Sequence, residues 1–356
     1  MPEAIEMDIE GRKAEHINIC LNQDVTPGRR YWDDIRLIHE ALPETDYDDI
    51  DTSAVVLGKR LDFPFIVNAI TGGFEGAKRI NENLAKACSE LGIGMGVGSQ
   101  RAAIEGSDTS SYSVIKDYDV PLVIGNVGAP QLIEQKKKKA FTKDDIEKAM
   151  DLIDADYMAV HLNYLQEVVQ PEGDLRSQGC FDAIRGLARD FPIIVKETGA
   201  GISSFTAKRL STIGVQAIDI GGMGGTSFSA IEMYRASAAG NALKAEVGST
   251  FFDWGIPSTV ALATVESEVP VISSGGILSG LDIARSIAMG AVCAAGSNIV
   301  LKEATESAEA VMEMLKLLKE EYKAAMLLTG SATTEEMSHA QYVIIGETRQ
   351  WMEGFR

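Results

Sequence analysis

The sequence predicts an α/β protein built as a closed barrel of eight parallel strands with helices outside, a (β/α)8 TIM barrel. The first observation is a set of short apolar, β-branched or glycine-rich runs, which are typical of buried strands. These runs occupy residues 65–70, 93–98, 122–126, 157–162, 193–197, 217–221, 270–274 and 292–296. The second observation is that stretches with helical periodicity lie between them. A doubly wound sheet is the alternative, but it rarely needs eight strands, and no GxGxxG motif opens the first helix.

Two of the helical stretches carry clear end signals. In TKDDIEKAMDLID, Thr142 is a candidate N-cap with acidic residues in the first turn, and apolar residues follow at helical spacing from Ile146 to Ile153. The stretch LDIARSIAMGA after Gly280 has the same character, and Gly290 marks its expected end.

Two places depart from the even alternation of strand and helix. Residues 1–64 precede the first barrel strand and are expected to form an N-terminal arm and layer packed on a barrel of residues 65–356, in one structural domain. The connection after the sixth strand, roughly residues 222–269, is too long for one helix and its turns. Long loops of this kind are where barrels carry their chemistry.

Composition excludes several classes of partner and location. The formal net charge of −19 over 356 residues disfavours a nucleic acid or an anionic membrane as partner. No apolar run reaches membrane-spanning length, the N-terminus lacks a signal-peptide core, and the four cysteines have no metal or redox spacing. We therefore expect a cytoplasmic protein with reduced cysteines.

Small and polar residues follow nearly every predicted strand. Because catalytic groups in such barrels sit at the C-terminal ends of the strands, a site is expected there. The strand ends read TGG (71–73), GSQR (98–101), GNVG (125–128), HLNYLQE (161–167), KETGAG (196–201), GGMGGTS (221–227), SGGI (274–277) and GS (296–297).

The last two of these turns predict a phosphate site. A glycine-rich turn lets backbone N–H groups approach a phosphate, and the helix that follows adds its N-terminal dipole. The loops after the seventh and eighth strands are also where barrels bind phosphate. Glycines needed only for tight turns are the alternative for either loop alone, and that alternative weakens because both loops carry the pattern.

Lys196 ends the fifth predicted strand near the barrel mouth. Such a lysine can form a Schiff base, anchor a phosphate or lie beside a cofactor ring, whereas the structural alternative is a salt bridge with Glu197. Hydrogen-bonding groups at other strand ends suit a planar heterocycle that lies across the mouth. These groups belong to Thr71, Ser99, Asn126 and Thr226.

Charged residues near the mouth suggest a second anion site. Arg101, with Arg12 and Lys13, can bind a phosphorylated substrate, although the last two also fit a solvated basic pair in the N-terminal arm. Glu167 can hold a Mg²⁺ ion that also takes phosphate oxygens and water. His161 fits a satisfied strand-end histidine as well as a catalytic one.

Several segments resemble the type 2 isopentenyl-diphosphate isomerase family, from about residue 10 to about residue 350. They are RKAEH (12–16), TGG (71–73), GSQR (98–101), GNVGAP (125–130), HLNYLQEVVQPEGD (161–174), VKETGAGIS (195–203), DIGGMGGTSF (219–228), DWGIPS (253–258) and SGGILSGLDIARSIAMGA (274–291). The resemblance is specific, because RKxxH, GSQR and HLNxLQE in this order are not general features of barrels.

The resemblance implies an FMN-binding barrel that interconverts isopentenyl diphosphate and dimethylallyl diphosphate in isoprenoid biosynthesis. It implies reduced FMN, Mg²⁺, NAD(P)H as reductant, and a homo-oligomer such as a tetramer or octamer. It assigns FMN contacts to Ala69, Ile70, Thr71, Ser99, Asn126, Lys196, Thr226, Gly275, Gly276, Ile277, Gly296 and Ser297. It assigns substrate contacts to Arg12, Lys13, His16, Ser99, Gln100, Arg101 and Gln166, the metal to Glu167, and catalytic positions to His161, Asn163, Gln166 and Glu232.

The chain departs from the family pattern at one position, and its strand-end motifs lack an obvious strong acid. Many family members carry Arg after SGGI, where this chain has Leu278, so FMN phosphate binding would depend more on backbone donors. No strand-end side chain is an obvious strong acid, which fits a reduced flavin as acid and base. The alternatives are an FMN-dependent oxidase or dehydrogenase of a small acid, and a non-enzymic flavin- or phosphate-binding protein.

Overall fold

Eight parallel strands form a closed barrel in the computed structural model, which describes residues 9–136 and 138–355. In order around the barrel the strands are β4 (Phe65–Val67), β5 (Gly94–Gly96), β6 (Val123–Gly128), β7 (Tyr157–Leu162), β8 (Ile193–Glu197), β9 (Ala217–Asp219), β10 (Val271–Ser274) and β11 (Cys293–Gly296). Each strand overlaps one predicted run, so the predicted fold class is confirmed. The pairing register joins His161 to Lys196 and Lys196 to Asp219, which brings these side chains to one level near the mouth.

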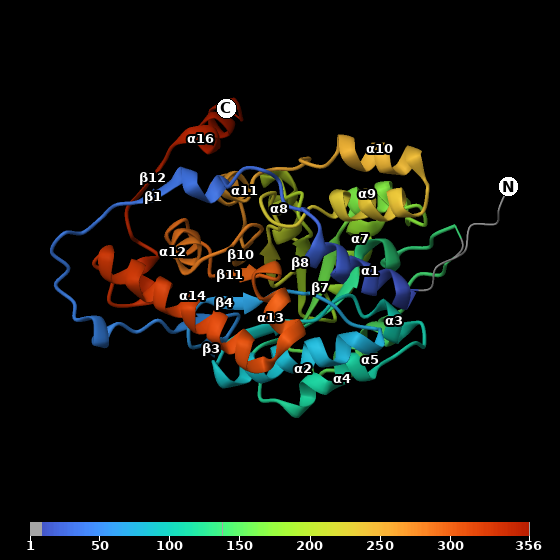
Figure 1. Ribbon diagram of the computed structural model, residues 1–356, viewed down its shortest axis with the longest axis horizontal. Helices are drawn as coiled ribbons and strands as arrows, with labels where there is room; N and C mark the ends of the chain where they lie inside the picture. Colours follow the sequence, from blue (N-terminus) through green and yellow to red (C-terminus); the bar gives the residue numbers. More distant parts are fainter. Residues whose placement is uncertain (1–8, 137, 356) are drawn as a thin grey trace.

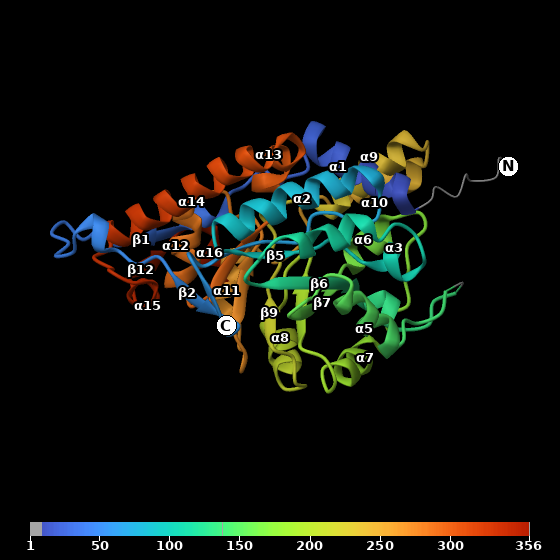
Figure 2. The ribbon, with the colours of Figure 1, turned by 90° about the horizontal axis from the view of Figure 1, so that it is seen from below.

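Helices and short helical turns surround the barrel (Figures 1 and 2). Those up to the fifth strand are α1 (Ile9–Asn22), α2 (Glu75–Glu90), α3 (Arg101–Ile104), α4 (Ser110–Ser113), α5 (Lys143–Asp151), α6 (Tyr164–Val169) and α7 (Cys180–Leu187). Those after it are α8 (Ser204–Ser211), α9 (Phe228–Ala238), α10 (Ala242–Thr250), α11 (Ser258–Thr264), α12 (Gly280–Ala288), α13 (Leu301–Glu306), α14 (Ala308–Leu328), α15 (Thr334–Met337) and α16 (Gly346–Gly354). The 3-10 turns are η1 (Tyr31–Asp34), η2 (Tyr47–Asp49), η3 (Val114–Asp117), η4 (Ala129–Leu132) and η5 (Asn298–Val300).

The predicted helix ends are confirmed. Thr142 caps α5 through a capping box with Asp145, which satisfies two backbone donors at the helix start. Helix α12 ends just before Gly290, whose φ of 97° requires a residue without a side chain.

A hairpin of the N-terminal layer closes the barrel at the end opposite the mouth. The hairpin of β2 (Ala54–Val56) and β3 (Lys59–Leu61) inserts Val56 and Leu61 among the apolar side chains of the barrel interior. Strand β1 (Ile35–Leu37) pairs antiparallel with β12 (Tyr342–Ile344), so this layer also contains a C-terminal strand (Figure 1). Residues 1–8 of the expected arm lie outside the described residues.

Helix α1 and the sixth connection meet beside the barrel mouth. The long connection after β9 contains α9, α10 and α11, and α9 packs against α1 (Figures 1 and 2). The N-terminal arm and the longest loop of the barrel therefore meet next to the strand ends at which the site is expected.

Two expectations from composition are tested by the fold. Within the described residues, no helix is long and apolar enough to cross a membrane. Cys20, Cys88, Cys180 and Cys293 are all free thiols, as expected from their wide spacing.

Candidate active site

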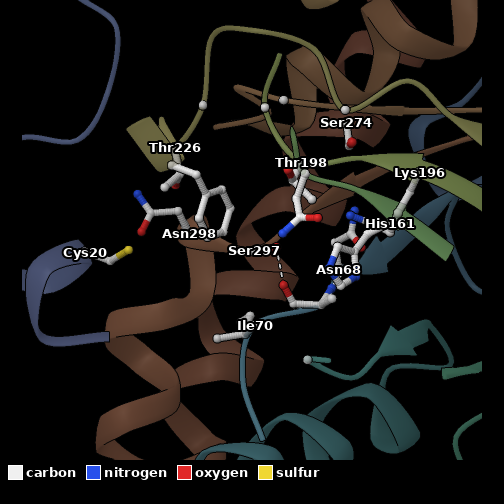
Figure 3. A pocket seen from close by; sticks show the side chains of 18 of the residues that line it. Cys20, Asn68, Ile70, His161, Lys196, Thr198, Thr226, Ser274, Ser297 and Asn298 are labelled. Atoms are coloured by element: carbon white, nitrogen blue, oxygen red, sulfur yellow. Dashed lines mark hydrogen bonds between the residues drawn. The ribbon is translucent and has the colours of Figure 1, made fainter. Parts of the chain in front are cut away.

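A cavity of about 300 Å³ opens at the C-terminal ends of the barrel strands. Its lining includes residues from helix α1 and from the loops after the barrel strands. Every predicted site residue lines this cavity except Gln100 and Glu232. Figure 3 shows that the cavity side chains of His161, Lys196 and Asn68 lie on one side and those of Thr226 and Asn298 on another.

One part of the lining consists of backbone donors from the loops after β10 and β11. Gly275 and Gly276 have φ of 98° and 75°, a conformation that glycine adopts without strain. Within the described chain, no acceptor takes the N–H groups of Gly276, Ile277 or Ser297. Unpaired N–H groups at a cavity wall are suited to a phosphate or a similar anion. We call these three residues the neutral side of the cavity.

Lys196 contributes an ammonium group from strand β8 to the cavity. Its side chain is 8% exposed, and Nζ makes a long hydrogen bond of 3.3 Å to the carbonyl of Glu197. The salt bridge considered with the Glu197 carboxylate is not formed, because neighbouring residues of a strand point to opposite faces. The Glu197 carboxylate instead accepts hydrogen bonds from the N–H groups of Gly199, Ala200 and Gly201. Burial raises the pKa of Glu197, and these N–H groups oppose that effect.

His161 is a neutral imidazole with a defined tautomer. Burial, with the charges of Lys196 and Lys13, lowers the pKa of His161 to about 3. The Asn126 amide donates to the carbonyl of Val97, which leaves its Oδ1 as the acceptor for His161 Nδ1 at 2.8 Å. The Nδ1–H form is therefore fixed, and His161 carries no proton at Nε2 near neutral pH.

The start of α6 presents Gln166 and Glu167 beside Asn163. Glu167 accepts hydrogen bonds from Asn163 Nδ2 at 3.0 Å and from the N–H of Asp174 at 2.6 Å. Burial is the main reason that the pKa of Glu167 is raised. Asn163 Oδ1 is buried and has no hydrogen-bond partner among the described residues. A buried carboxylate next to an unpaired amide oxygen fits a hard divalent cation.

The described residues contain no cluster of three or more His, Cys, Asp or Glu that could enclose a metal ion. A cation here would therefore depend on one carboxylate, neighbouring oxygens and groups of the ligand itself. Magnesium is commonly bound in this way together with substrate phosphates.

Glu232 lies behind the wall formed by His16 and Gln166. Its carboxylate is 0% exposed and accepts hydrogen bonds from His16 at 2.9 Å, from Gln166 Nε2 at 3.1 Å and from Arg235. Burial alone would raise the pKa of Glu232, but His16 and Arg235 outweigh it and lower the pKa to about 2. Glu232, which the resemblance gives as a catalytic position, thus contacts Gln166 from outside the cavity.

The cations expected at the substrate differ in how they are engaged. In the part of the chain that the structure describes, Arg12 Nε is buried without a partner, and the ion pair of Arg12 with Glu172 is long, at 3.7 Å. Arg101 bonds to Asp174 and Glu105. We call Arg12, Arg101 and Glu167 the charged side of the cavity.

Lys13 is held by the barrel loops. Its ammonium donates to the carbonyls of Gly72 and Ser99 and to the Tyr112 hydroxyl, so it fastens α1 to the loops after β4 and β5.

The structure does not support a substrate contact for the Gln100 side chain. Gln100 is fully buried outside the cavity lining, where Nε2 donates to the carbonyl of Ala149 and Oε1 accepts the N–H of Asn126. It lies in a sequence segment of cavity residues, but its side chain fixes the packing of α5 and β6 instead.

Three cavity residues in Figure 3, Asn68, Thr198 and Asn298, were not singled out from the sequence. Asn298 directly follows the GS motif (296–297), Thr198 lies within the KETGAG motif (196–201), and Asn68 lies within the predicted run 65–70, so weighing every polar residue of these segments would have found them. Asn68 also donates to Asp219 at 2.8 Å, a contact between β4 and β9 that spacing along the chain does not predict.

Comparison with known proteins identifies the family to which the chain belongs. An isopentenyl-diphosphate delta-isomerase of Thermoplasma acidophilum is 49% identical over 343 residues, which cover 96% of this chain and 98% of the relative. The protein of the same name from Archaeoglobus fulgidus is 42% identical over 352 residues, covering 98% of this chain and 99% of the relative. The chain belongs to the isopentenyl-diphosphate delta-isomerase family. The profile of the FMN-dependent dehydrogenase family also matches residues 173–343, which identifies the type 2, FMN-dependent form of that family.

Solved structures agree with the fold of this isomerase-family chain. A flavocytochrome b2 mutant superposes with a TM-score of 0.64 at 16% identity, covering 95% of this chain and 80% of the other. A mandelate oxidase with an FMN adduct gives a TM-score of 0.58 at 16% identity, covering 96% and 94%. At this identity the likeness concerns the barrel architecture alone.

Proposed function

We propose that this protein interconverts isopentenyl diphosphate and dimethylallyl diphosphate. The reaction is a 1,3-proton shift, in which a proton is added to the terminal CH₂ of the alkene and another leaves the carbon two positions away. The observation that carries the proposal is that one cavity presents both unpaired backbone donors for a phosphate and a buried carboxylate beside an unpaired guanidinium nitrogen. Membership of the isomerase family supports the substrate.

FMN, when bound in its reduced form, would supply the acid–base group, as the family resemblance implies. The N–H groups of Gly276, Ile277 and Ser297 would hold its phosphate. The side chains of Asn126, Lys196 and Thr226 would contact its ring and ribityl chain. The neutral Nδ1–H tautomer of His161 holds the Asn126 amide in its orientation.

Glu167 would hold Mg²⁺ together with oxygens of the substrate diphosphate. The unpaired Asn163 Oδ1 supports this assignment, because an amide oxygen accepts either the metal or a water bound to it. Arg12 and Arg101 contribute positive charge on the same side. Binding energy from the diphosphate then positions the short prenyl chain.

Gln166 would assist proton movement on the substrate side. Its amide is oriented from behind by Glu232, which is in turn held by His16 and Arg235. Because Glu232 stays ionised at neutral pH, it keeps the Gln166 NH₂ group pointed toward itself and the Gln166 carbonyl oxygen toward Asn163.

The family resemblance further supports NAD(P)H as the reductant of the flavin, a homo-oligomer of four or eight chains, and a cytoplasmic location.

The test is anaerobic incubation of the purified protein with FMN, a chemical reductant and Mg²⁺, followed by NMR of isopentenyl diphosphate. We expect conversion to dimethylallyl diphosphate that needs reduction of the flavin and is lost with EDTA. Absence of conversion under these conditions would refute the proposal. Bleaching of the oxidised flavin by a 2-hydroxy acid would instead support the FMN-dependent oxidase or dehydrogenase alternative.

A further inference from the structure

The carbonyl of Gly275 is held from behind the cavity wall by two side chains. Trp32 Nε1 donates to it at 2.9 Å, and Ser258 Oγ donates at 2.7 Å. Trp32 is 2% exposed and Ser258 is 1% exposed, and neither lines the cavity. Trp32 comes from η1 of the N-terminal layer, and Ser258 begins α11 of the sixth connection.

This arrangement fixes the direction of the next N–H group. The peptide between Gly275 and Gly276 is trans and planar, so its C=O and N–H point in opposite directions. Since the carbonyl points away from the cavity toward Trp32 and Ser258, the N–H of Gly276 points toward the cavity. No acceptor in the described part of the chain takes this N–H group.

The peptide needs such a hold because it lies between two glycines. Glycine adopts positive and negative φ with similar ease, so a Gly–Gly peptide can rotate at little cost unless its neighbours fix it. A side chain at 275 is also excluded, since its Cβ would overlap the carbonyl oxygen of Gly222 and the Ser258 hydroxyl. Gly225 lies on the N–H side of the peptide between Gly275 and Gly276. Because Gly225 has no Cβ, this side stays open, whereas a Cβ at position 225 would lie 2.7 Å from Gly276 N.

No cation replaces these donors on the neutral side. Among the described lining residues, the Lys and Arg side chains come from α1, α3 and β8. Behind the loop, Arg30 and Arg285 both bond to Asp282, whose carboxylate also accepts the N–H of Leu278. The positive charge nearest this loop is therefore already paired with a carboxylate.

We propose that Trp32 and Ser258 are positioning residues for phosphate recognition: by holding the Gly275 carbonyl, they aim the Gly276 N–H at the phosphate of the flavin. The inference rests on the FMN binding of the proposed function. Trp32 comes from the N-terminal layer and Ser258 from the sixth connection, so both segments would orient the loop after β10, to which neither belongs.

Riboflavin, which lacks the phosphate, separates this role from a general effect on packing. Dissociation constants of FMN and riboflavin are to be measured by quenching of flavin fluorescence for wild type, Trp32→Phe and Ser258→Ala. Matched controls are Trp351→Phe on α16 and Ser229→Ala, whose buried hydroxyl donates to the carbonyl of Gly248.

Losing one orienting hydrogen bond should weaken FMN binding by about five- to tenfold. Riboflavin binding should stay within about twofold of wild type, and both controls should bind both ligands as wild type does.

Equal weakening of FMN and riboflavin would overturn the inference, because Trp32 and Ser258 would then act only through stability. Unchanged FMN binding in both variants would overturn it as well. If Trp32→Phe does not fold, Ser258→Ala alone decides. Normal FMN binding in a wild-type protein without isomerase activity would refute the proposed function and leave this inference to be judged by the two variants.

Discussion

The charged side and the neutral side of the cavity bind negative charge by different means. On the charged side, Arg12 and Arg101 lie near Glu167, and several carboxylates balance them. On the neutral side, Gly276, Ile277 and Ser297 offer only N–H groups. Charge-assisted contacts are strong and respond to salt and pH, whereas neutral donors depend on exact direction. A phosphate on the charged side would thus be held by charge, and a phosphate on the neutral side by the direction of the N–H groups.

The largest effect is expected from Glu167→Gln on the charged side. The amide cannot replace a carboxylate that holds Mg²⁺, so kcat/KM should fall by about 100-fold or more and the dependence on Mg²⁺ should disappear. In wild type, protonation competes with the metal, and because the pKa of Glu167 is raised, Mg²⁺ affinity should decline as the pH falls through it. Activity assays across Mg²⁺ concentration and calorimetric Mg²⁺ titrations at several pH values measure both.

The matched control for this variant is Glu266→Gln, an exposed carboxylate paired with Lys208 away from the cavity. Retention of the wild-type Mg²⁺ dependence in Glu167→Gln would contradict the metal assignment.

An intermediate effect is expected from Leu278→Arg, which adds charge to the neutral side. Leu278 is 43% exposed and lines the cavity, so an arginine there can reach the phosphate without entering the core. FMN affinity should rise by about three- to tenfold at low salt, and this gain should shrink as salt increases. Riboflavin affinity should not change. A gain that is equal for riboflavin, or one that is insensitive to salt, would show that the phosphate lies elsewhere.

The smallest effect concerns His161, which also lines the cavity. Its folded pKa of about 3 is below the ordinary value of 6.5, so between these pH values the unfolded chain binds one more proton than the folded chain. The free energy of unfolding therefore falls as pH drops through this window, by at most about 1.4 kcal/mol per pH unit for this group.

Replacing His161 by Gln should make that fall shallower by about one proton. Urea unfolding of wild type and variant between pH 7 and pH 4 measures the slopes, and His339→Gln, at an exposed site, is the control. Parallel slopes in wild type and His161→Gln would contradict the low pKa.

Spacing along the chain predicted the barrel, and it also predicted that the residues after the strands meet at one mouth, where the structure has a cavity. Strand ends converge on one face of a barrel, so the residues after β4 to β11 lie close together whatever their side chains are. The resemblance assigned a substrate contact to Gln100, whose side chain instead bonds to Ala149 and Asn126, because a motif places a residue at the mouth without giving the direction of its side chain. Spacing also left the partner of Lys196 open, and the opposite facing of adjacent strand residues decided it.

Contacts between distant segments were beyond the sequence. Trp32 and Gly275 are 243 residues apart, and His16 and Glu232 are 216 apart, so no local pattern links them. Their meeting depends on how the N-terminal layer and the sixth connection pack around the barrel.

The sequence by itself determined the alternation of strands and helices, the helix caps, and the list of groups at the barrel mouth, because these follow from local periodicity and backbone preference. Only the tertiary structure decided which of those groups are satisfied. Burial lowered the pKa of His161 and raised the pKa of Glu167, and packing left Arg12 Nε, Asn163 Oδ1 and the Gly276 N–H without partners among the described residues. Desolvation and hydrogen-bond completion depend on all neighbours in space, and those neighbours come from the whole chain.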